Sequence, residues 1–515
     1  MFLSRGERRI ILTTNTLTTN VGSFKMDKGT SATVAYQLLD GSPSLNFASF
    51  VHTWMPEEGL KLVVENISKV AHALQMCCIA DQDEYPATMR VHGRAVSMLA
   101  DLWKVPKGNK AIGTATGGSS EAIMLGGLAL KKAWQERRKA AGKDHYHPNI
   151  VMGANAQVAL EKFARYFDVE CRLVPVTKEG GYVMQPKDAI KYVDENTIGI
   201  FVILGSTYTG GFEDVQGMSD LLDEYEARTG ISIPIHVDAA SGGFIAPFAY
   251  PGYKWGFDIS RVHSINTSGH KFGLTFVGWV LWKDESLLHK DLIFELHYLG
   301  STEYSYTLNF SRPSAPILAQ MFNFLHLGFE GYRRIAQADL TNARMLSRAL
   351  EKSTYYTCVS NIHIPLADDS NGTGAGREVV GKTPRVVDED QAEYYQRGLP
   401  VVAFRFSDKF KREYPHIQQA WIQNLLRAKQ WIVPNYNLPP NEEKTEILRI
   451  VVRESMNADL IERVTLDILN ITEQLKGAQL TDPLPSPLHS STDPIFEKIW
   501  YWHLGFDNVD RMRDE

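Results

Sequence analysis

Short apolar runs and longer amphipathic stretches alternate through the middle of the chain. The apolar runs have the length of buried strands, and the stretches between them place apolar residues at helical spacing. The strand candidates are 150–153, 199–204, 234–237 and 261–266, and the helix candidates are 120–140, 156–167 and 218–229. This alternation predicts an α/β fold, with a mostly parallel central sheet and helices on both faces.

A smaller α+β domain is predicted toward the C-terminus. Residues 401–406 and 447–452 have the pattern of strands, and residues 459–475 that of a last helix, which Gly477 can end. We expect an N-terminal segment over 1–45, a large domain over 46–339, a small domain over 340–476 and a mobile tail over 477–515. The Gly-rich and polar residues 367–384, followed by the acidic residues 388–390, predict a mobile surface loop.

Composition and charge exclude several classes of protein. Hydrophobic residues make up 44% and charged residues 22% of the 515 residues, which is typical of globular proteins rather than disordered or fibrous ones. Lys+Arg 54 against Asp+Glu 60 leaves a net charge of −6, so no basic excess indicates a nucleic-acid partner. The most apolar stretches, 198–204 and 276–282, are far shorter than the roughly 18 residues of a membrane span.

The cysteines indicate a reducing compartment. Because they include no CxxC pair, the sequence predicts neither a disulfide framework nor a zinc site; the four are Cys77, Cys78, Cys171 and Cys358. At the N-terminus, Glu7 and weak amphipathicity argue against a transit peptide, and the apolar core of a secretory signal is missing. We therefore expect a cytoplasmic protein without a metal site.

The first motif that carries chemistry is Thr116-Gly-Gly-Ser-Ser-Glu-Ala, which leads into an Ala/Leu-rich helix. Its glycines allow close approach of the backbone, and Ser119 and Ser120 can cap the helix. The free N–H groups and the positive end of the helix dipole would then hold a phosphate group. Taken alone, the motif is explained at least as well by a serine cap with nothing bound.

The second motif is His236-Val-Asp-Ala-Ala, at the end of a predicted strand. The Asp238 carboxylate in this position can bind a metal, act as a base, pair with a cationic ring nitrogen or only fix a loop. The third motif, Ser264-Ile-Asn-Thr-Ser-Gly-His-Lys-Phe, places Lys271 among small and aromatic neighbours. Partial desolvation lowers the pKa of such a lysine and frees its amine as a nucleophile, although a lysine lying over aromatic surface explains it as well.

The three motifs together favour one interpretation. A phosphate site, a carboxylate for a pyridinium nitrogen and a lysine that forms a Schiff base are what pyridoxal 5′-phosphate needs. The order of the motifs, and the spacing between Asp238 and Lys271, fit the large domain of a fold-type I enzyme.

Four motifs carry a resemblance to a known family. The chain resembles the glutamate decarboxylases, which are group II pyridoxal-phosphate decarboxylases, from about Asn46 to the helix near Leu475. The motifs are Gly118-Ser-Ser-Glu-Ala, His236-Val-Asp-Ala-Ala-Ser-Gly-Gly-Phe, Ser268-Gly-His-Lys-Phe-Gly-Leu and Asn309-Phe-Ser-Arg-Pro. The resemblance implies decarboxylation of L-glutamate to 4-aminobutyrate and CO₂ through a Lys271 Schiff base.

The resemblance also implies roles for single residues. Asp238 would keep the ring nitrogen of the cofactor protonated. The phosphate would be held by Ser119, Ser120, Ser268 and His270, and the ring and its hydroxyl would be contacted by Gln157, Ala240 and Thr207. Phe310 and Ser311 would reach the phosphate of a neighbouring subunit, which implies a homodimer or a larger homo-oligomer.

Substrate selection would rest on other positions. Arg449 would hold a substrate carboxylate, for which its planar guanidinium is suited. Without the resemblance, its position would indicate a surface arginine at the end of a strand. Ser49 and Phe50 would receive the distal carboxylate beside Asp81, whose pKa would have to be raised. Tyr298 would lie over the site and, like Lys271, could return the proton.

Two other functions remain open. A decarboxylase or lyase of the same fold could act on another amino acid or amine, although Arg449 and Asp81 suit a dicarboxylic substrate. An inactive homologue could bind the cofactor only, because residues 70–78 look like an insertion and the segment after Lys271 looks about two residues short of the family pattern. In the tail, 495–515, acidic residues outnumber basic ones, which argues against calmodulin binding.

Overall fold

The computed structural model describes residues 45–47, 57–61, 86–296, 303–309, 313–366 and 391–477. Contacts divide the chain into Met1–Leu45 and Asn46–Glu515, and the fold described below is that of the second unit. The predicted surface loop at 367–390, the tail after Gly477 and the extra segment 70–78 lie outside the described residues. Within these ranges, no helix combines the length and the apolar character needed to cross a membrane.

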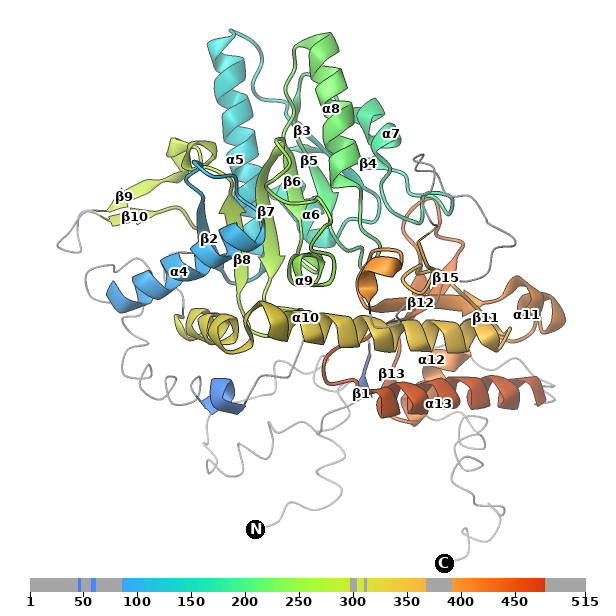
Figure 1. Cartoon of the computed structure of the whole chain (residues 1–515). Coiled ribbons are helices and arrows are strands. Elements are labelled where there is room, and N and C mark those ends of the chain that lie inside the picture. Colours follow the sequence, from blue (N-terminus) through green and yellow to red (C-terminus); the bar gives the residue numbers. More distant parts are fainter. Residues whose placement is uncertain are drawn as a thin grey trace, which may run out of the picture. The chain divides into compact units, whose positions relative to one another are not determined.

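Seven strands form the large sheet, in the order β2-β8-β7-β6-β5-β3-β4 (Figure 1). Neighbouring strands from β7 to β4 are parallel, and β8 runs antiparallel between β2 and β7. The bounds are β2 Ile112–Thr116, β3 Asn149–Gly153, β4 Glu170–Val174, β5 Thr197–Ile203, β6 Ile235–Asp238, β7 Val262–Ser268 and β8 Gly278–Trp282. The prediction of a mostly parallel sheet is confirmed.

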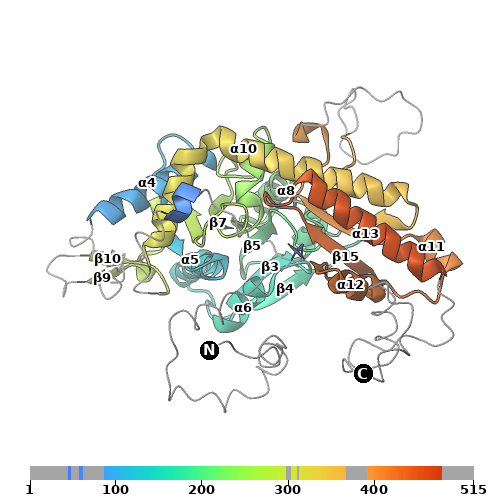
Figure 2. The same cartoon turned by 90° about the horizontal axis from the view of Figure 1, so that it is seen from below.

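Helices cover both faces of this sheet, because successive side chains of a buried strand point to opposite sides. In β3, Ile150 and Met152 belong to one apolar core, together with residues of α5 (Ser119–Ala140) and α6 (Val158–Tyr166). Val151, between them, belongs to a second core with residues of α4 (Pro86–Leu102), α8 (Val215–Thr229) and α10 (Ala315–Lys352). Figure 2 shows these two helical layers on opposite sides of the sheet.

The small sheet is antiparallel and has the order β11-β12-β15-β14. Its strands are β11 Tyr356–Cys358, β12 Val401–Phe406, β14 Asn435–Asn437 and β15 Glu446–Val451, and its helices are α11 Asp408–Glu413, α12 Gln419–Ala428 and α13 Ala458–Gly477. The helical spacing that predicted α13 corresponds to its buried face, which includes Ile461, Val464, Ile468, Ile471 and Leu475.

The sequence pattern did not predict α10, a helix of 38 residues. It packs against elements of both the large and the small domain. It contacts α4 and α9 (Ala246–Ala249) near its start and β11, β12 and α13 further along (Figure 1). Its backbone leaves helical geometry at Gly328 (φ 57°, ψ −167°), a conformation that glycine adopts without strain.

The shorter elements are β1 Leu45–Asn46, α7 Pro186–Ala189, η3 Ile190–Tyr192, η4 Gly242–Phe244, η5 Glu285–Leu287, η6 Lys290–Leu292, β9 Phe294–Leu296, β10 Glu303–Ser305, η7 Ala392–Tyr394 and β13 Trp431–Ile432.

Candidate active site

The predicted cofactor residues gather at one edge of the large sheet. Each lies at the carboxyl end of a strand, in the loop that follows it or in the first turn of the next helix, where open α/β sheets bind ligands. They are Ser119 and Ser120 after β2, Gln157 after β3, Thr207 after β5, Asp238 and Ala240 at the end of β6, and Ser268, His270 and Lys271 at the end of β7.

Lys271 lies at the centre of this edge. Its Nζ donates a hydrogen bond of 2.9 Å to Oγ of Ser241, in the turn after β6. Burial lowers the pKa of the Lys271 amine, the negative charge of Asp238 raises it, and the positive charge of Arg449 lowers it again. The Lys271 amine therefore lies within electrostatic reach of both the Asp238 carboxylate and the Arg449 guanidinium.

Asp238 is held by two hydrogen bonds to one carboxylate oxygen. Oδ1 accepts from Nδ2 of Asn266 at 2.9 Å and from the backbone N–H of Ala240 at 3.1 Å. Its side chain is almost fully buried (4% exposed). The carboxylate therefore has a fixed direction at the end of β6.

Behind Asp238, a buried histidine fixes the asparagine. His236 Nε2 lies 2.7 Å from Oδ1 of Asn266, and Nδ1 lies 2.7 Å from Oγ of Ser264. Since the asparagine donates from Nδ2 to Asp238, its Oδ1 must accept, so His236 carries its proton on Nε2. Burial lowers the pKa of His236 to about 4, which keeps the ring neutral. The chain His236–Asn266–Asp238 thus orients the carboxylate.

At the first turn of α5, one detail of the prediction is wrong. The residue that caps the helix is Gly118, with an extended backbone and no capping side chain, so Ser119 and Ser120 are the first two helical residues rather than caps. The helix begins one residue earlier than the pattern indicated because glycine can enter it without a side-chain bond. The backbone N–H groups of a first helical turn have no partner within the helix, so they can bind a phosphate group.

Ser268 provides the strongest sign of an anion at this edge. Its side chain is fully buried, and within the described residues its Oγ has no hydrogen-bond partner. A buried hydroxyl without a partner is costly, so a ligand oxygen is the natural partner. His270 lies on the same side as the α5 turn, since its Cε1 would be 3.7 Å from a Cβ on Gly118.

Gln157, Thr207 and Arg449 surround a pocket of about 200 Å³, which is lined by Ala156, Gln157, Val158, Thr207, Tyr208, Tyr436 and Arg449. Gln157 Nε2 lies 2.5 Å from Oγ1 of Thr207, and Arg449 Nη1 donates to the Thr207 carbonyl oxygen at 2.7 Å. Arg449 is buried (8% exposed), and its guanidinium lies 5.5 Å from the centre of the Tyr436 ring. It is therefore not the surface arginine that its sequence position would ordinarily indicate.

The other predicted site residues cannot be placed. Those that lie outside the described residues are Ser49, Phe50, Asp81, Tyr298, Phe310 and Ser311. The predicted distal carboxylate site and the predicted contact with a neighbouring subunit therefore stay predictions.

Three residues that the sequence analysis did not single out complete the site: Ser241, Asn266 and Glu213. Asn266 had a detectable signal, because Ser264, Asn266 and Ser268 are polar at every second position of a buried strand and therefore share a face. The register pairs Asn266 with Asp238 across β6 and β7.

Glu213 is buried beneath the loops of Gln157 and Thr207. Its carboxylate accepts hydrogen bonds from the N–H of Ile203 (2.7 Å), the N–H of Met184 (3.2 Å) and Nδ2 of Asn155 (3.1 Å). Burial raises the pKa of Glu213 to about 7, against the effect of these bonds. Through these bonds Glu213 connects the end of β3 to the end of β5. Nothing in the local sequence indicates this role.

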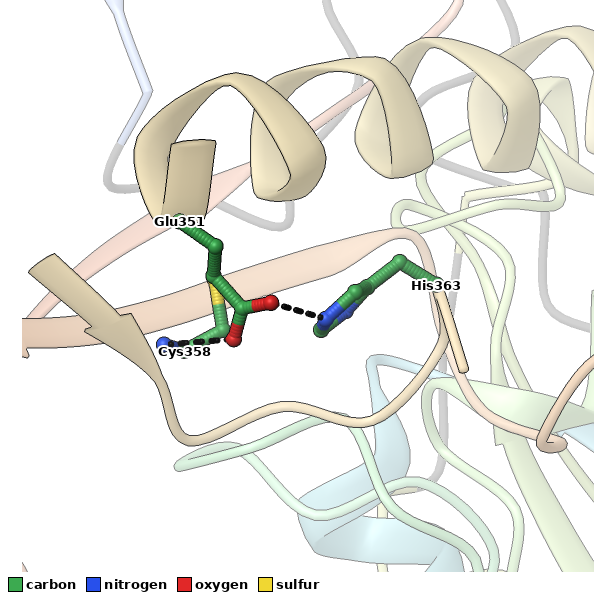
Figure 3. A group of neighbouring side chains, drawn as sticks. All are labelled: Glu351, Cys358 and His363. Atoms are coloured by element: carbon green, nitrogen blue, oxygen red, sulfur yellow. Dashed lines mark hydrogen bonds and ion pairs between the residues drawn. The ribbon is translucent and has the colours of Figure 1, made fainter. Parts of the chain in front are cut away.

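A second group of polar side chains lies in the small domain (Figure 3). Glu351, Cys358 and His363 bring one potential ligand atom each within 4.8 Å of the others. However, the two Glu351 oxygens accept from the Cys358 N–H at 3.2 Å and pair with His363 Nε2 at 3.1 Å, and Cys358 Sγ donates to the Ser347 carbonyl oxygen. Burial raises the pKa of the Cys358 thiol, which opposes the thiolate that a metal needs. The group serves to join α10 to β11 and the loop that follows.

Comparison with known proteins agrees with this arrangement. Residues 27–367 match the model of the pyridoxal-dependent decarboxylase conserved domain. The chain is 46% identical over 477 residues to a glutamate decarboxylase of Saccharomyces cerevisiae (87% of this chain, 78% of the relative) and 44% identical over 463 residues to one of Solanum lycopersicum (88% and 83%). The solved structure of Lactobacillus brevis glutamate decarboxylase superposes with a TM-score of 0.75 at 32% identity, over 92% of this chain and 99% of that one. With the lysine, the carboxylate and the helix turn in place at one sheet edge, the chain belongs to the pyridoxal-dependent decarboxylase family.

Proposed function

We propose that this protein decarboxylates L-glutamate to 4-aminobutyrate and CO₂ with pyridoxal 5′-phosphate as its cofactor. The observation that carries the proposal is the grouping of Lys271, Asp238 and a buried Arg449 at one edge of the large sheet. The names of the relatives support glutamate as the substrate, and an arginine is suited to a carboxylate.

The residues at this edge fit the proposed cofactor. The hydroxyl of Ser268, which has no partner among the described residues, would bind the phosphate together with Ser119, Ser120 and His270. Gln157 would cover one face of the ring, Ala240 would lie against the other, and Thr207 would contact the ring hydroxyl. When bound, the cofactor accepts into its ring the electron pair that loss of CO₂ leaves behind.

Each polar group of the chain then has one task. Lys271 would supply the amine that holds the cofactor, and its lowered pKa favours the neutral form that this role needs. Asp238 would pair with the protonated ring nitrogen, with its direction set by Asn266. Arg449 binds a substrate carboxylate and so turns the bond to be broken out of the ring plane.

The proton that replaces CO₂ comes from a residue of the chain. Lys271 or Tyr298 would donate it. Ser49 and Phe50 would receive the distal carboxylate, and Asp81 would share a proton with it.

We further propose a cytoplasmic homodimer or larger homo-oligomer. Several apolar side chains near the lysine loop and on the β9–β10 hairpin are exposed in the single chain, and a second copy would cover them; they are Phe276 (65% exposed), Phe294 (62%) and Tyr304 (53%). Phe310 and Ser311 would reach the partner's cofactor. The division into 1–45, 46–339, 340–476 and 477–515 is kept as a proposal; its boundary at 339/340 falls inside α10.

The decisive experiment measures CO₂ and amine release by the purified protein with added pyridoxal phosphate, from acid to neutral pH. L-Glutamate is compared with L-aspartate and aromatic amino acids, and Lys271→Ala is the control. Release from glutamate alone, lost in Lys271→Ala, is the expected result. Release from a different amino acid would support the alternative substrate class, and cofactor binding without any turnover would support an inactive homologue.

A further inference from the structure

The backbone just after Lys271 is held by two side chains of α10. The carbonyl oxygen of Gly273 accepts a hydrogen bond from Nε2 of Gln320 at 3.1 Å and another from the hydroxyl of Tyr332 at 3.0 Å. Both side chains are buried, with Gln320 at 0% and Tyr332 at 3% exposed. They come from opposite sides of the kink at Gly328, so the kink lets both parts of α10 reach one carbonyl.

These three groups form a closed triangle of hydrogen bonds. Gln320 Nε2 also donates to the Tyr332 oxygen at 3.2 Å. The amide has two hydrogens, the hydroxyl has one and the carbonyl has two lone pairs, so all three bonds can exist together. Although Gln320 Oε1 has no partner among the described residues, two buried donors converge on the Gly273 carbonyl oxygen and restrict where it can lie.

The next residue shows why the turn needs support. Leu274 is buried and has a left-handed backbone (φ 62°), which residues with a side chain rarely adopt. Its carbonyl oxygen accepts a hydrogen bond of 3.1 Å from Nδ2 of Asn323, one turn after Gln320. The strained turn persists because α10 binds two successive carbonyl groups of it.

Tyr332 also supports the group that Lys271 contacts. Its ring stacks on Phe248 (4.9 Å between centres) and on Phe244 (5.9 Å). Phe244 belongs to η4, directly after Ser241, whose hydroxyl accepts from Lys271 Nζ. One side chain therefore supports both partners of the lysine contact.

We propose that Gln320 and Tyr332 are positioning residues for Lys271, holding the turn 272–274 so that the lysine amine faces Ser241 and Asp238. This inference rests on the proposed function only in that Lys271 is the amine that bonds to the cofactor. Neither residue lines the pocket at Arg449, and both act through the backbone of Gly273. Their effect is on where the amine lies and how far it is shielded from water.

The test uses Tyr332→Phe and Gln320→Leu, with Tyr356→Phe as the matched control. Tyr356 is also fully buried, but it lies in the small domain. Its replacement by phenylalanine removes a single hydrogen bond, of 2.7 Å to Thr472. Two quantities are measured: the pH dependence with which acetic anhydride labels Lys271 in the protein freed of cofactor, by peptide mass spectrometry, and the dissociation constant of pyridoxal phosphate. Thermal unfolding of each variant is recorded in parallel.

The expected result separates the variants. In Tyr332→Phe and Gln320→Leu, water reaches the amine, the midpoint of labelling rises by about one pH unit, and the dissociation constant of the cofactor rises about tenfold. Tyr356→Phe loses thermal stability to a similar extent but keeps the wild-type midpoint and dissociation constant. A labelling midpoint and a dissociation constant equal to those of wild type in Tyr332→Phe would overturn the proposal. If Gln320→Leu does not fold, the result for Tyr332→Phe is sufficient to test it.

The labelling result is independent of the proposed function. If Lys271→Ala binds the cofactor as tightly as wild type, the covalent role of Lys271 fails. The shift in the labelling midpoint still shows whether α10 positions the lysine.

Discussion

The guanidinium of Arg449 donates a hydrogen bond of 2.7 Å to the carbonyl oxygen of Thr207, a residue 242 positions earlier in the chain. The contact joins β15 of the small sheet to the loop after β5 of the large sheet. It fixes the arginine at the wall of the pocket that Gln157 and Tyr208 also line. A group proposed to select substrate is thus attached directly to a loop proposed to hold the cofactor.

Arg449→Lys is expected to lower kcat/KM for L-glutamate by about 30- to 150-fold, mainly through KM. A lysine keeps the charge but loses the fork, and a hydrogen bond to a charged group contributes about 2–3 kcal/mol. Steady-state kinetics with saturating cofactor measures the change. Arg405→Lys is the control, because Arg405 lies on the neighbouring strand β12 and pairs with Asp408 on the surface. Equal losses in both variants would contradict a role in substrate binding.

Asp238→Asn is expected to lower kcat by about 100-fold or more while the fold is kept. The asparagine oxygen can still accept from Asn266 and Ala240, so only the negative charge beside the cofactor ring is removed. Initial rates and thermal unfolding are measured on the same preparation. A kcat close to wild type would show that Asp238 only fixes the loop, the alternative that the sequence left open.

Ser268→Ala and Ser264→Ala are expected to act in opposite ways. In the protein without cofactor, Ser268→Ala should leave the free energy of unfolding unchanged or raise it by up to about 1 kcal/mol, because the hydroxyl it removes has no partner in the described part of the chain. Ser264→Ala should lower it by about 1 kcal/mol, because Nδ1 of His236 loses its bond. Only Ser268→Ala should weaken binding of pyridoxal phosphate, by about tenfold. Urea unfolding and a cofactor titration give both numbers, and unchanged cofactor binding in Ser268→Ala would remove it from the phosphate site.

The buried groups His236 and Glu213 should make the free energy of unfolding depend on pH in opposite directions. His236 has a folded pKa of about 4, below its unfolded value, so the unfolded chain binds more protons and stability falls as pH drops from about 6.5 to 4. Glu213 has a folded pKa of about 7, above its unfolded value, so the folded chain binds more protons and stability falls as pH rises from about 4.5 to 7. Each effect amounts to about 3 kcal/mol over its range.

When one of the two groups is substituted, the pH dependence of stability that remains is that of the other group. Between pH 4.5 and 6.5, Glu213→Gln should gain stability with rising pH relative to wild type, and His236→Gln should lose it. Urea unfolding of the three proteins at a series of pH values tests the signs. Parallel curves for wild type and both variants would show that neither group changes protonation in this range.

The sequence predicted the strand-end residues because their signals are local. Lys271, Asp238 and the α5 turn each lie within a few residues of a strand that its apolar pattern reveals, and parallel strands bring such ends together. Ser119 and Ser120 were wrongly predicted as caps because the extended Gly118 takes that position, and a sequence does not show where a helix begins to within one residue.

What the sequence could not predict depends on contacts between distant segments. Asn266 matters because the register of β6 and β7 places it opposite Asp238. Glu213 is a common acidic residue at the start of a helix until Ile203, Met184 and Asn155 are seen around it. Arg449 looked like a surface residue because its burial comes from the large domain, far away in the chain.

The division of the pocket between two sheets has a consequence for how such an enzyme can change. The groups proposed to hold the cofactor belong to the edge of the large sheet, whereas Arg449 and Tyr436 stand on β15 and β14. Arg449 bonds to the Thr207 carbonyl oxygen, so mutations at the other positions of these two strands are expected to alter which acid is accepted with the least change at the proposed cofactor site. For a protein engineer, these positions of β14 and β15 are the ones to randomise in a library aimed at new substrates, with Arg449, the Lys271 turn and its α10 support left untouched.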